Sequence, residues 1–178
     1  YRSRGMEIVC PLAGEHQVVN SLTAAVALTH LAVPVKGIEE AKWPGRLERI
    51  AENPDVILDG AHNPAGVRAL VAYIRRFFGD RKIWLVYGTM RDKSVDEVIG
   101  NLSQVATEVI ATQVDLPRAL RPAALAEMFD HPRVRTAPNV KAALETIDRE
   151  AAPTDIAFVT GSLFLVGEAR KITKTAVS

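Results

Sequence analysis

Short apolar segments that alternate with helical patterns constrain the fold of this chain more than any other feature of its sequence. The run Ile83-Trp84-Leu85-Val86-Tyr87 is unbroken and ends at Gly88. Strands that are apolar on both faces are typical of a sheet that is covered by crossover helices on both sides. We therefore predict an α/β fold with an open, mostly parallel sheet.

The remaining elements of this pattern follow the same alternation. Predicted strands cover residues 47–51, 56–58, 83–87, 109–112, a short segment from Val134, and 156–159. Predicted helices cover residues 64–78, 94–102, 122–129, 139–147 and a final segment after Ser162. Because ligands of such sheets bind beyond the carboxyl ends of the strands, the candidate loops are 59–63, 88–93, 112–118 and 160–162.

A different pattern precedes the sheet. Residues 6–10 predict a short strand, and apolar residues at helical spacing predict a helix over 15–31. A stretch with Pro34, Gly37 and Trp43-Pro44-Gly45 follows. We interpret residues 33–45 as a linker and place a domain boundary there.

Composition argues against several classes of function. Lys and Arg total 22 and Asp and Glu total 21, so net charge gives no reason to expect nucleic acid or an anionic membrane as a partner. No apolar run reaches the roughly 20 residues that span a bilayer. Cys10 is the single cysteine, which fits a reducing compartment such as the cytoplasm. The first residues include no starting methionine, and we expect the chain to be part of a longer protein.

The segment from Asp59 to Pro64 lies where a predicted strand ends and a helix begins. Asp59 can accept hydrogen bonds from a diol such as a ribose, and a protonated His62 can bind an anion. The amino end of the helix also favours an anionic group. An ordinary turn, in which Asp59 and Asn63 serve only as caps, explains the same residues. The residues alone leave both interpretations open.

Arg46 and Asn20 are candidates of a second kind. Arg46 can hold a phosphate in a bidentate fork, but a surface ion pair explains it equally well. Glu48 is expected to pair with Arg46 or with Arg49. Asn20 could read an adenine edge, or it could belong to a solvated helix face.

Ser162 and the pair Asp92-Lys93 complete the candidates. Ser162 suits an N-cap, a donor to a carboxylate, or both, because the two roles use the same geometry. Asp92-Lys93 could orient a substrate, or could begin a solvated helix. The spacing of the four histidines matches no zinc signature, so we assign no metal ligands. The sequence also has no Gly-x-x-x-x-Gly-Lys-[Ser/Thr] phosphate loop.

Five short motifs occur in order along nearly the whole chain. They are Leu12-Ala13-Gly14-x-His16-Gln17-x-x-Asn20, Trp43-Pro44-Gly45-Arg46-Leu47-Glu48, Asp59-Gly60-Ala61-His62-Asn63-Pro64-x-Gly66, Gly88-x-x-x-Asp92-Lys93 and Thr160-Gly161-Ser162-Leu163-Phe164. Together they resemble folylpolyglutamate synthase and dihydrofolate synthase of the Mur ligase superfamily. The resemblance implies a Rossmann-like carboxy-terminal domain over residues 43–178. It also implies that residues 1–42 are a linker and a short helical remnant of a central ATPase domain.

The resemblance also implies a reaction. ATP phosphorylates a carboxylate of a folate or dihydropteroate, and the amine of L-glutamate attacks the acyl phosphate through a tetrahedral intermediate. The phosphate loop and the Mg²⁺ ligands are expected upstream of Tyr1. The chain alone is therefore expected to lack ligase activity, and the full-length enzyme is expected to be a monomer in the cytoplasm.

Individual residues take roles from the same resemblance. On the nucleotide side, Asn20 resembles the adenine contact, Arg46 the phosphate contact and Asp59 the contact on the ribose side of ATP. The residues assigned to the glutamate side are His62, which is also the catalytic candidate, Ser162, Asp92 and Lys93.

Two other functions remain open. One is a Mur-type ligase that acts on a different carboxylate, such as a muramyl peptide. The other is a non-catalytic α/β module that uses Asp59 and Arg46 to bind a nucleotide or an amino acid. The amino acids of the motifs at residues 60–64 and 160–163 favour the folate ligases.

Overall fold

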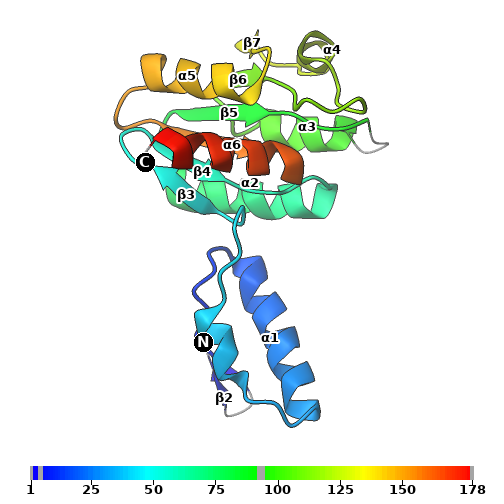
Figure 1. The fold of residues 1–178 in the computed structure, drawn as a ribbon, viewed down its shortest axis with the longest axis vertical. Coiled ribbons are helices and arrows are strands. Elements are labelled where there is room, and N and C mark those ends of the chain that lie inside the picture. Colours follow the sequence, from blue (N-terminus) through cyan, green and yellow to red (C-terminus); the bar gives the residue numbers. More distant parts are fainter. Residues whose placement is uncertain (1, 4–5, 92–94, 177–178) are drawn as a thin grey trace.

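The computed structural model describes residues 2–3, 6–91 and 95–176 of the 178-residue chain. Most of them form a sheet with helices on both faces, and a smaller amino-terminal unit lies beyond one edge of the sheet (Figure 1). Within the described residues, no helix has the length and apolar character needed to cross a membrane.

The sheet has six strands in the order β3-β4-β8-β5-β6-β7. Their bounds are Glu48–Ala51 for β3, Asp55–Leu58 for β4, Ile83–Tyr87 for β5, Glu108–Ala111 for β6, Val134–Thr136 for β7 and Ile156–Thr160 for β8. Only the edge strand β3 is antiparallel to its neighbour, and every other pair of neighbouring strands is parallel. The predicted open, mostly parallel sheet is confirmed.

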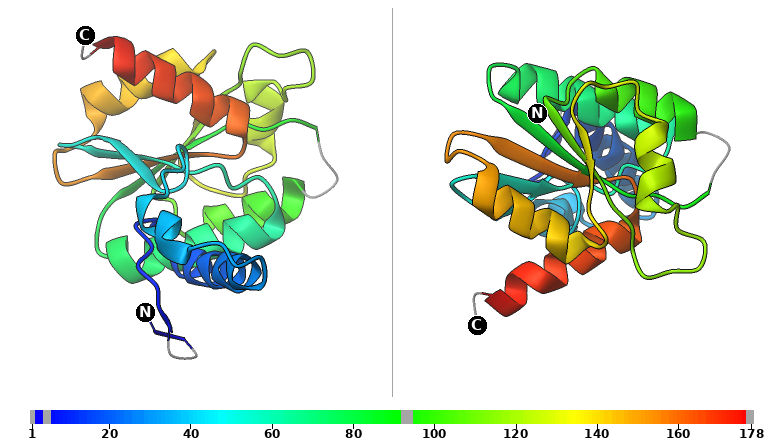
Figure 2. Two further views of the ribbon diagram at one scale, coloured as in Figure 1. Left: turned by 60° about the horizontal axis from the view of Figure 1, so that its bottom comes forward. Right: turned by 90° about the horizontal axis from the view of Figure 1, so that it is seen from above.

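Helices cover the two faces of the sheet in separate groups, as Figure 2 shows. One face carries α2 (Pro64–Phe78), α3 (Val95–Ser103) and α4 (Pro122–Glu127), and the other carries α5 (Val140–Glu150) and α6 (Leu163–Ala176). Each group encloses its own buried apolar cluster against the sheet. The strands are apolar on both faces because each face must contact a layer of helices.

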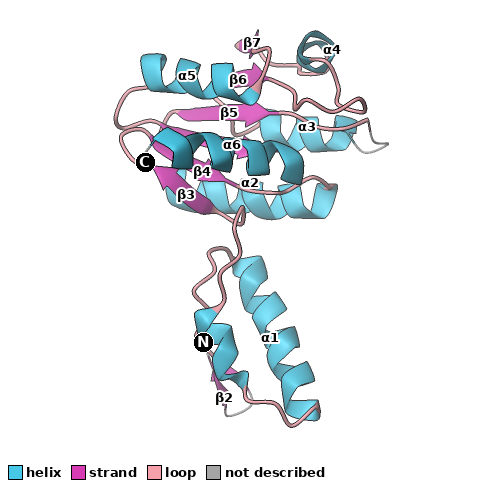
Figure 3. Ribbon diagram, viewed as in Figure 1, coloured by secondary structure: helices cyan, strands magenta, loops and turns pink. Residues whose placement is uncertain are grey.

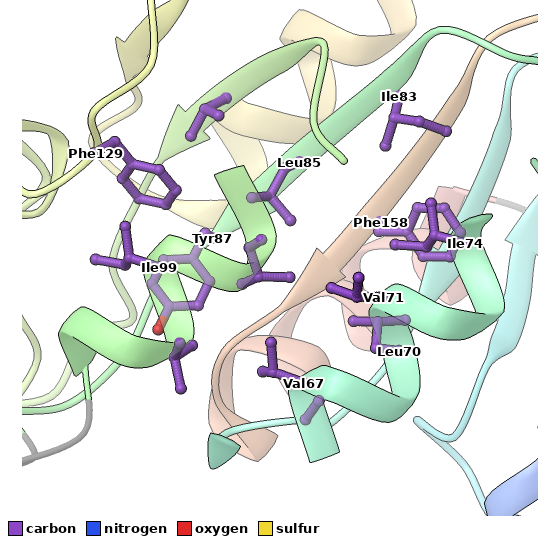
Figure 4. Close-up of a cluster of buried hydrophobic side chains, with 14 of the residues drawn as sticks. Val67, Leu70, Val71, Ile74, Ile83, Leu85, Tyr87, Ile99, Phe129 and Phe158 are labelled. Atoms are coloured by element: carbon purple, nitrogen blue, oxygen red, sulfur yellow. The ribbon is translucent and has the colours of Figure 1, made fainter. Parts of the chain in front are cut away.

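The cluster under α2 and α3 contains most of the large buried side chains of the molecule (Figure 4). Val67, Leu70 and Ile74 are buried on one side of α2, in the same apolar cluster as Phe158 of the central strand β8. Tyr87 at the end of β5 packs edge-on against Phe129, with ring centroids 5.7 Å apart. This packing fixes the carboxyl ends of β5 and β8 relative to α2.

The amino-terminal unit is mainly helical (Figure 3). It contains α1 (Glu15–His30), the 3-10 helix η1 (Val35–Glu40) and two short antiparallel strands, β1 (Arg2–Ser3) and β2 (Met6–Glu7). Ile8, Ala25 and Ile38 form its small buried cluster.

Two predictions for this region were wrong in part. The strand expected over residues 6–10 is only the two residues of β2. The expected linker over 33–45 contains η1, because Ile38 can bury its side chain against α1. Residues 41–47 have no helix or strand and connect the amino-terminal unit to β3.

The position of β8 determines where a ligand can bind. The last strand in the sequence lies between β4 and β5. From β4 the chain continues into α2 on one face, and from β8 it continues into α6 on the opposite face. Loops that diverge in this way leave a crevice at the carboxyl ends of the strands.

Candidate functional site

Two loops that are distant in sequence meet at this crevice. Asp59 donates its backbone N–H to the carbonyl of Val159 at 3.0 Å. The carbonyl of Ala61 accepts from the Gly161 N–H at 3.0 Å and from the Thr160 hydroxyl at 3.1 Å. The motif after β4 and the motif after β8 therefore form one surface.

Gly161 occupies a place that no other residue fits without rearrangement. Its φ of +107° lies in the left-handed region, and a Cβ atom there would lie 2.4 Å from Cε2 of Tyr87 and 2.8 Å from the Gly88 carbonyl oxygen. The chain must pass this closely for the loop after β8 to reach the loop after β5.

Asp59 is buried and forms two bonds to backbone amides. Its Oδ1 accepts from the Ala61 N–H at 2.9 Å, and its Oδ2 accepts from the Leu47 N–H at 3.1 Å. Burial raises the pKa of the carboxyl group above its ordinary value, whereas the amide bonds and nearby positive charges lower it. Those charges belong to Arg46 and His16. Each carboxylate oxygen keeps a second lone pair that can accept a hydrogen bond, and the residue is only 4% exposed.

Arg46 lies on the turn that Asp59 holds. The residues on either side, Gly45 and Leu47, have φ values of +73° and +48°. Within the described part of the chain, the Arg46 guanidinium has no ion pair and no hydrogen bond. It is therefore a partly exposed cation that can bind an anionic group beside Asp59.

Glu48 has a different partner from the one expected. It pairs with Arg170 of α6 at 2.8 Å rather than with Arg46 or Arg49. Arg49 pairs instead with Glu52 and Asp55. The expected Glu48 pairs were wrong because they considered only neighbours in the sequence.

His62 and Ser162 line one small pocket of about 220 Å³. His62 Nδ1 lies 2.8 Å from the Gly60 carbonyl oxygen. Because a carbonyl can only accept, Nδ1 bears a proton, and Nε2 is left to accept or donate toward a ligand. The Ser162 hydroxyl oxygen accepts from the Phe164 N–H at 3.2 Å, so Ser162 caps α6. The pocket is lined by His62, Thr89, Met90, Gly161, Ser162, Leu163 and Phe164.

Two apolar residues of this pocket were absent from the predicted site. Leu163 and Phe164 are 53% and 63% exposed, although they begin a helix that packs on the sheet. Their place directly after Ser162 in a motif was the available signal. Thr89 and Met90 lie in the candidate loop 88–93, but neither was singled out as a site residue.

Asn63 is the N-cap of α2, as predicted. Its side-chain oxygen accepts from the Gly66 N–H at 2.8 Å, and Pro64 is the first helical residue. The N-terminus of α2 therefore begins directly after His62, where its amide groups favour an anionic ligand.

The amino-terminal motif lies beside the Arg46 turn. A Cβ atom on Gly14 would lie 2.6 Å from the His16 ring and 3.2 Å from the Leu47 side chain. Asn20, one turn further along α1, donates to Gln17 at 3.1 Å. Asn20 lines a separate pocket of about 570 Å³ between α1 and η1, together with Trp43.

Some predicted features lie outside these contacts. Asp92 and Lys93, the remaining candidates for the glutamate side, fall outside the described residues. Among residues 2–3, 6–91 and 95–176, no three His, Cys, Asp or Glu side chains form a group that could hold a metal ion.

The site thus has two sides that meet at the loop 59–62. On one side are Asp59, Arg46 and the N-terminus of α1, and on the other are His62 and Ser162. The Mur ligase, glutamate ligase domain model matches residues 45–163, which is more than half of the chain. The chain belongs to the Mur ligase family. Both sides of its candidate site fall within the glutamate ligase domain, apart from α1.

Relatives of this glutamate ligase domain are much longer proteins. A "Probable bifunctional folylpolyglutamate synthase/dihydropteroate synthase" of Haloferax volcanii is 36% identical over 97% of this chain and 21% of that protein. A crystal structure of Mycobacterium tuberculosis folylpolyglutamate synthase, complexed with ADP and AMPPCP, has a TM-score of 0.82. It is 34% identical and covers 93% of this chain and 42% of that one. The chain therefore spans less than half the length of these relatives.

A ligase with a muramoyl substrate in its name is also related. The Buchnera aphidicola protein named UDP-N-acetylmuramoyl-L-alanyl-D-glutamate–2,6-diaminopimelate ligase is 28% identical over 84% of this chain and 32% of that protein.

Proposed function

We propose that this chain supplies ATP and L-glutamate contacts to an ATP-dependent ligase that joins L-glutamate to a folate or dihydropteroate carboxylate. The two-sided site around residues 59–62 is the observation on which this proposal rests. Further support comes from relatives with folylpolyglutamate synthase names, one of them complexed with ADP and AMPPCP. In this proposal residues 1–42 are the end of the ATPase domain with its linker, and residues 43–178 are the carboxy-terminal domain.

The nucleotide is proposed to bind along Asp59, Arg46 and Asn20. The Arg46 guanidinium, which has no partner among the described residues, suits the phosphates, and the remaining lone pairs of Asp59 suit the ribose hydroxyls. Asn20 offers an amide to the adenine edge at the neighbouring pocket. ATP is expected to bring Mg²⁺, which neutralises phosphate charge, with ligands that the family resemblance places upstream.

L-glutamate is proposed to bind at the His62 and Ser162 pocket. The first residues of α6 line this pocket, and α2 begins two residues after His62, so the amino ends of both helices favour a carboxylate there. The free Nε2 of His62 can accept a proton from the glutamate amine as it attacks the acyl phosphate. Phosphate then leaves from the tetrahedral intermediate and an amide bond remains. Asp92 and Lys93 stay predictions for the same substrate.

A second candidate function is a Mur-type ligase for another carboxylate, which the Buchnera relative supports. A third is a module that binds a nucleotide or an amino acid without catalysis. Incubating the complete protein with ATP, L-glutamate and either a folate or a muramyl peptide distinguishes the first two functions by the amide formed. Bound ATP with neither product would identify the third.

The site assignment is tested by exchanging one residue on each side in the complete protein. Arg46→Met removes a cation that has no partner in the described chain, so it should raise the KM for ATP about tenfold with little loss of stability. Asp59→Ala should also raise the KM for ATP, and His62→Ala should raise the KM for glutamate. An unchanged ATP dependence in both Arg46→Met and Asp59→Ala would refute the nucleotide side.

The cellular compartment and the oligomeric state of the enzyme are part of the same proposal. The cytoplasm is proposed because the chain has only one cysteine. The monomeric state of the full-length enzyme stays a prediction, which light scattering of the complete protein would test.

A further inference from the structure

Arg46 lies between two residues with left-handed backbone conformations. Gly45 adopts φ +73° without cost, but Leu47 adopts φ +48° although its side chain makes that region unfavourable. A non-glycine residue keeps such a conformation only when surrounding bonds hold it. The turn that presents Arg46 must therefore be fixed by its neighbours.

Two carboxylates fix the backbone on either side of Arg46. Glu48 Oε2 accepts from the Gly45 N–H at 2.7 Å, and Asp59 Oδ2 accepts from the Leu47 N–H at 3.1 Å. The Gly45 carbonyl oxygen accepts from the Gly60 N–H at 2.8 Å. The turn is thus bonded to the loop after β4 and to the first residue of β3.

Glu48 is itself held by a helix from the end of the chain. The Nε of Arg170 lies 2.8 Å from Oε1 and 3.1 Å from Oε2 of Glu48. The two side chains are 25% and 32% exposed, so water screens the pair less than it would screen a surface pair. Gly45 also lies directly against α6, because a Cβ atom on it would be 2.6 Å from Val166.

We propose that Glu48 and Arg170 are positioning residues that set the direction of Arg46 toward the nucleotide phosphates. This inference rests on the proposed ATP contact of Arg46. Without the Glu48 carboxylate, the Gly45 N–H loses its acceptor, and of these bonds only the Asp59 bond to Leu47 and the Gly60 bond to Gly45 still hold the turn. The Arg46 side chain then points in several directions, and binding must order it again at an entropic cost.

The competing explanation is an ion pair that only stabilises the fold. A purely structural pair would lower stability and change all kinetic constants alike, whether or not Arg46 is present. A positioning pair acts through Arg46, so its effect on ATP must disappear when Arg46 is absent.

The test is a double-mutant cycle in the complete protein. Glu48→Ala is expected to raise the KM for ATP about tenfold, as the loss of a hydrogen bond to a charged group would, and to leave the KM for glutamate within about twofold. In an Arg46→Met background, Glu48→Ala should raise the KM for ATP no further. Arg170→Met should also raise the KM for ATP. Glu48→Gln, which keeps an acceptor for Gly45, should have a smaller effect.

Glu97→Gln is the matched control, because it breaks the exposed Arg68–Glu97 ion pair, with an N–O distance of 2.8 Å, between α2 and α3. It should change neither KM. The positioning role would be overturned if the increases in the KM for ATP caused by Glu48→Ala and Arg46→Met multiplied in the double variant. It would also be overturned if Glu48→Ala changed the KM values for ATP and glutamate equally.

The proposed function can fail separately from this inference. If the unaltered complete protein binds ATP but forms no amide, the ligase proposal fails, and the same cycle is then run on the Kd for ATP by titration calorimetry. If Glu48→Ala does not fold, Arg170→Lys replaces it, because lysine keeps the charge but loses the geometry of the guanidinium. An unchanged KM or Kd for ATP in that variant overturns the inference.

Discussion

Replacing Gly161 with alanine is the substitution with the clearest expected cost. A Cβ atom there would lie 2.4 Å from the Tyr87 ring and 2.8 Å from the Gly88 carbonyl oxygen, at a φ of +107°. The backbone strain costs about 1–3 kcal/mol. Overpacking of the core adds about 1–3 kcal/mol. Because Tyr87 is only 1% exposed, its ring has little room to move away. We expect the free energy of unfolding to fall by about 2–6 kcal/mol.

The same exchange at Gly100 is the control for Gly161→Ala. Gly100 lies within α3, and nothing lies within 4 Å of the Cβ atom that alanine would add. Gly100→Ala should therefore raise the free energy of unfolding by up to about 1 kcal/mol through helix propensity. Urea unfolding of the 178-residue chain at pH 7, followed by circular dichroism, measures both variants. A Gly161→Ala loss below about 1 kcal/mol would refute the close approach of the loop to β5.

Two further predictions concern a helix cap and a buried charge. Asn63→Ala and Asn139→Ala each remove a cap that accepts from the backbone N–H three residues later, at 2.8 and 2.9 Å, so each should cost about 1 kcal/mol in urea unfolding. A much larger loss for Asn63 alone would show that it has a structural role beyond the cap. Burial raises the pKa of Glu108, but Arg133, Lys82 and Arg135 lower it more, so its pKa lies below the ordinary value of 4.5. Its stabilising effect is therefore present above pH 4.5 and is lost as the pH falls through the lowered pKa. Glu108→Gln should destabilise the chain at pH 7 and match the unaltered chain in acid, and an equal deficit at both pH values would contradict this.

Elements with strong local signals could be predicted from the sequence. The strand over 83–87 matches β5, and Asn63-Pro64 begins α2 where a capping residue and a proline indicate. These signals are local because backbone preferences and caps involve residues only a few positions apart. The 3-10 helix at Val35–Glu40 was not predicted, because Ile38 has an apolar surface to pack against only once α1 is in place.

The contacts that shape the candidate site depend on distant partners. The Glu48–Arg170 pair joins residues 122 positions apart, and neither residue indicates the other. The sequence identified Asp59 as important but could not show that both of its oxygens accept from backbone amides. Burial of that carboxylate follows from the strand order, which short strands of similar apolar character do not reveal.

The central place of β8 determines when the sheet can close during synthesis of the chain. Strands β4 and β5 do not bond to each other, and each pairs with β8 instead. A nascent chain that ends before Ile156 therefore has two open strand edges at the middle of its sheet, and such edges invite pairing with other chains. The loop 160–162 emerges with the same strand. Closing the sheet and bringing Ser162 to the pocket of His62 are therefore one late event, and truncation before β8 would prevent both.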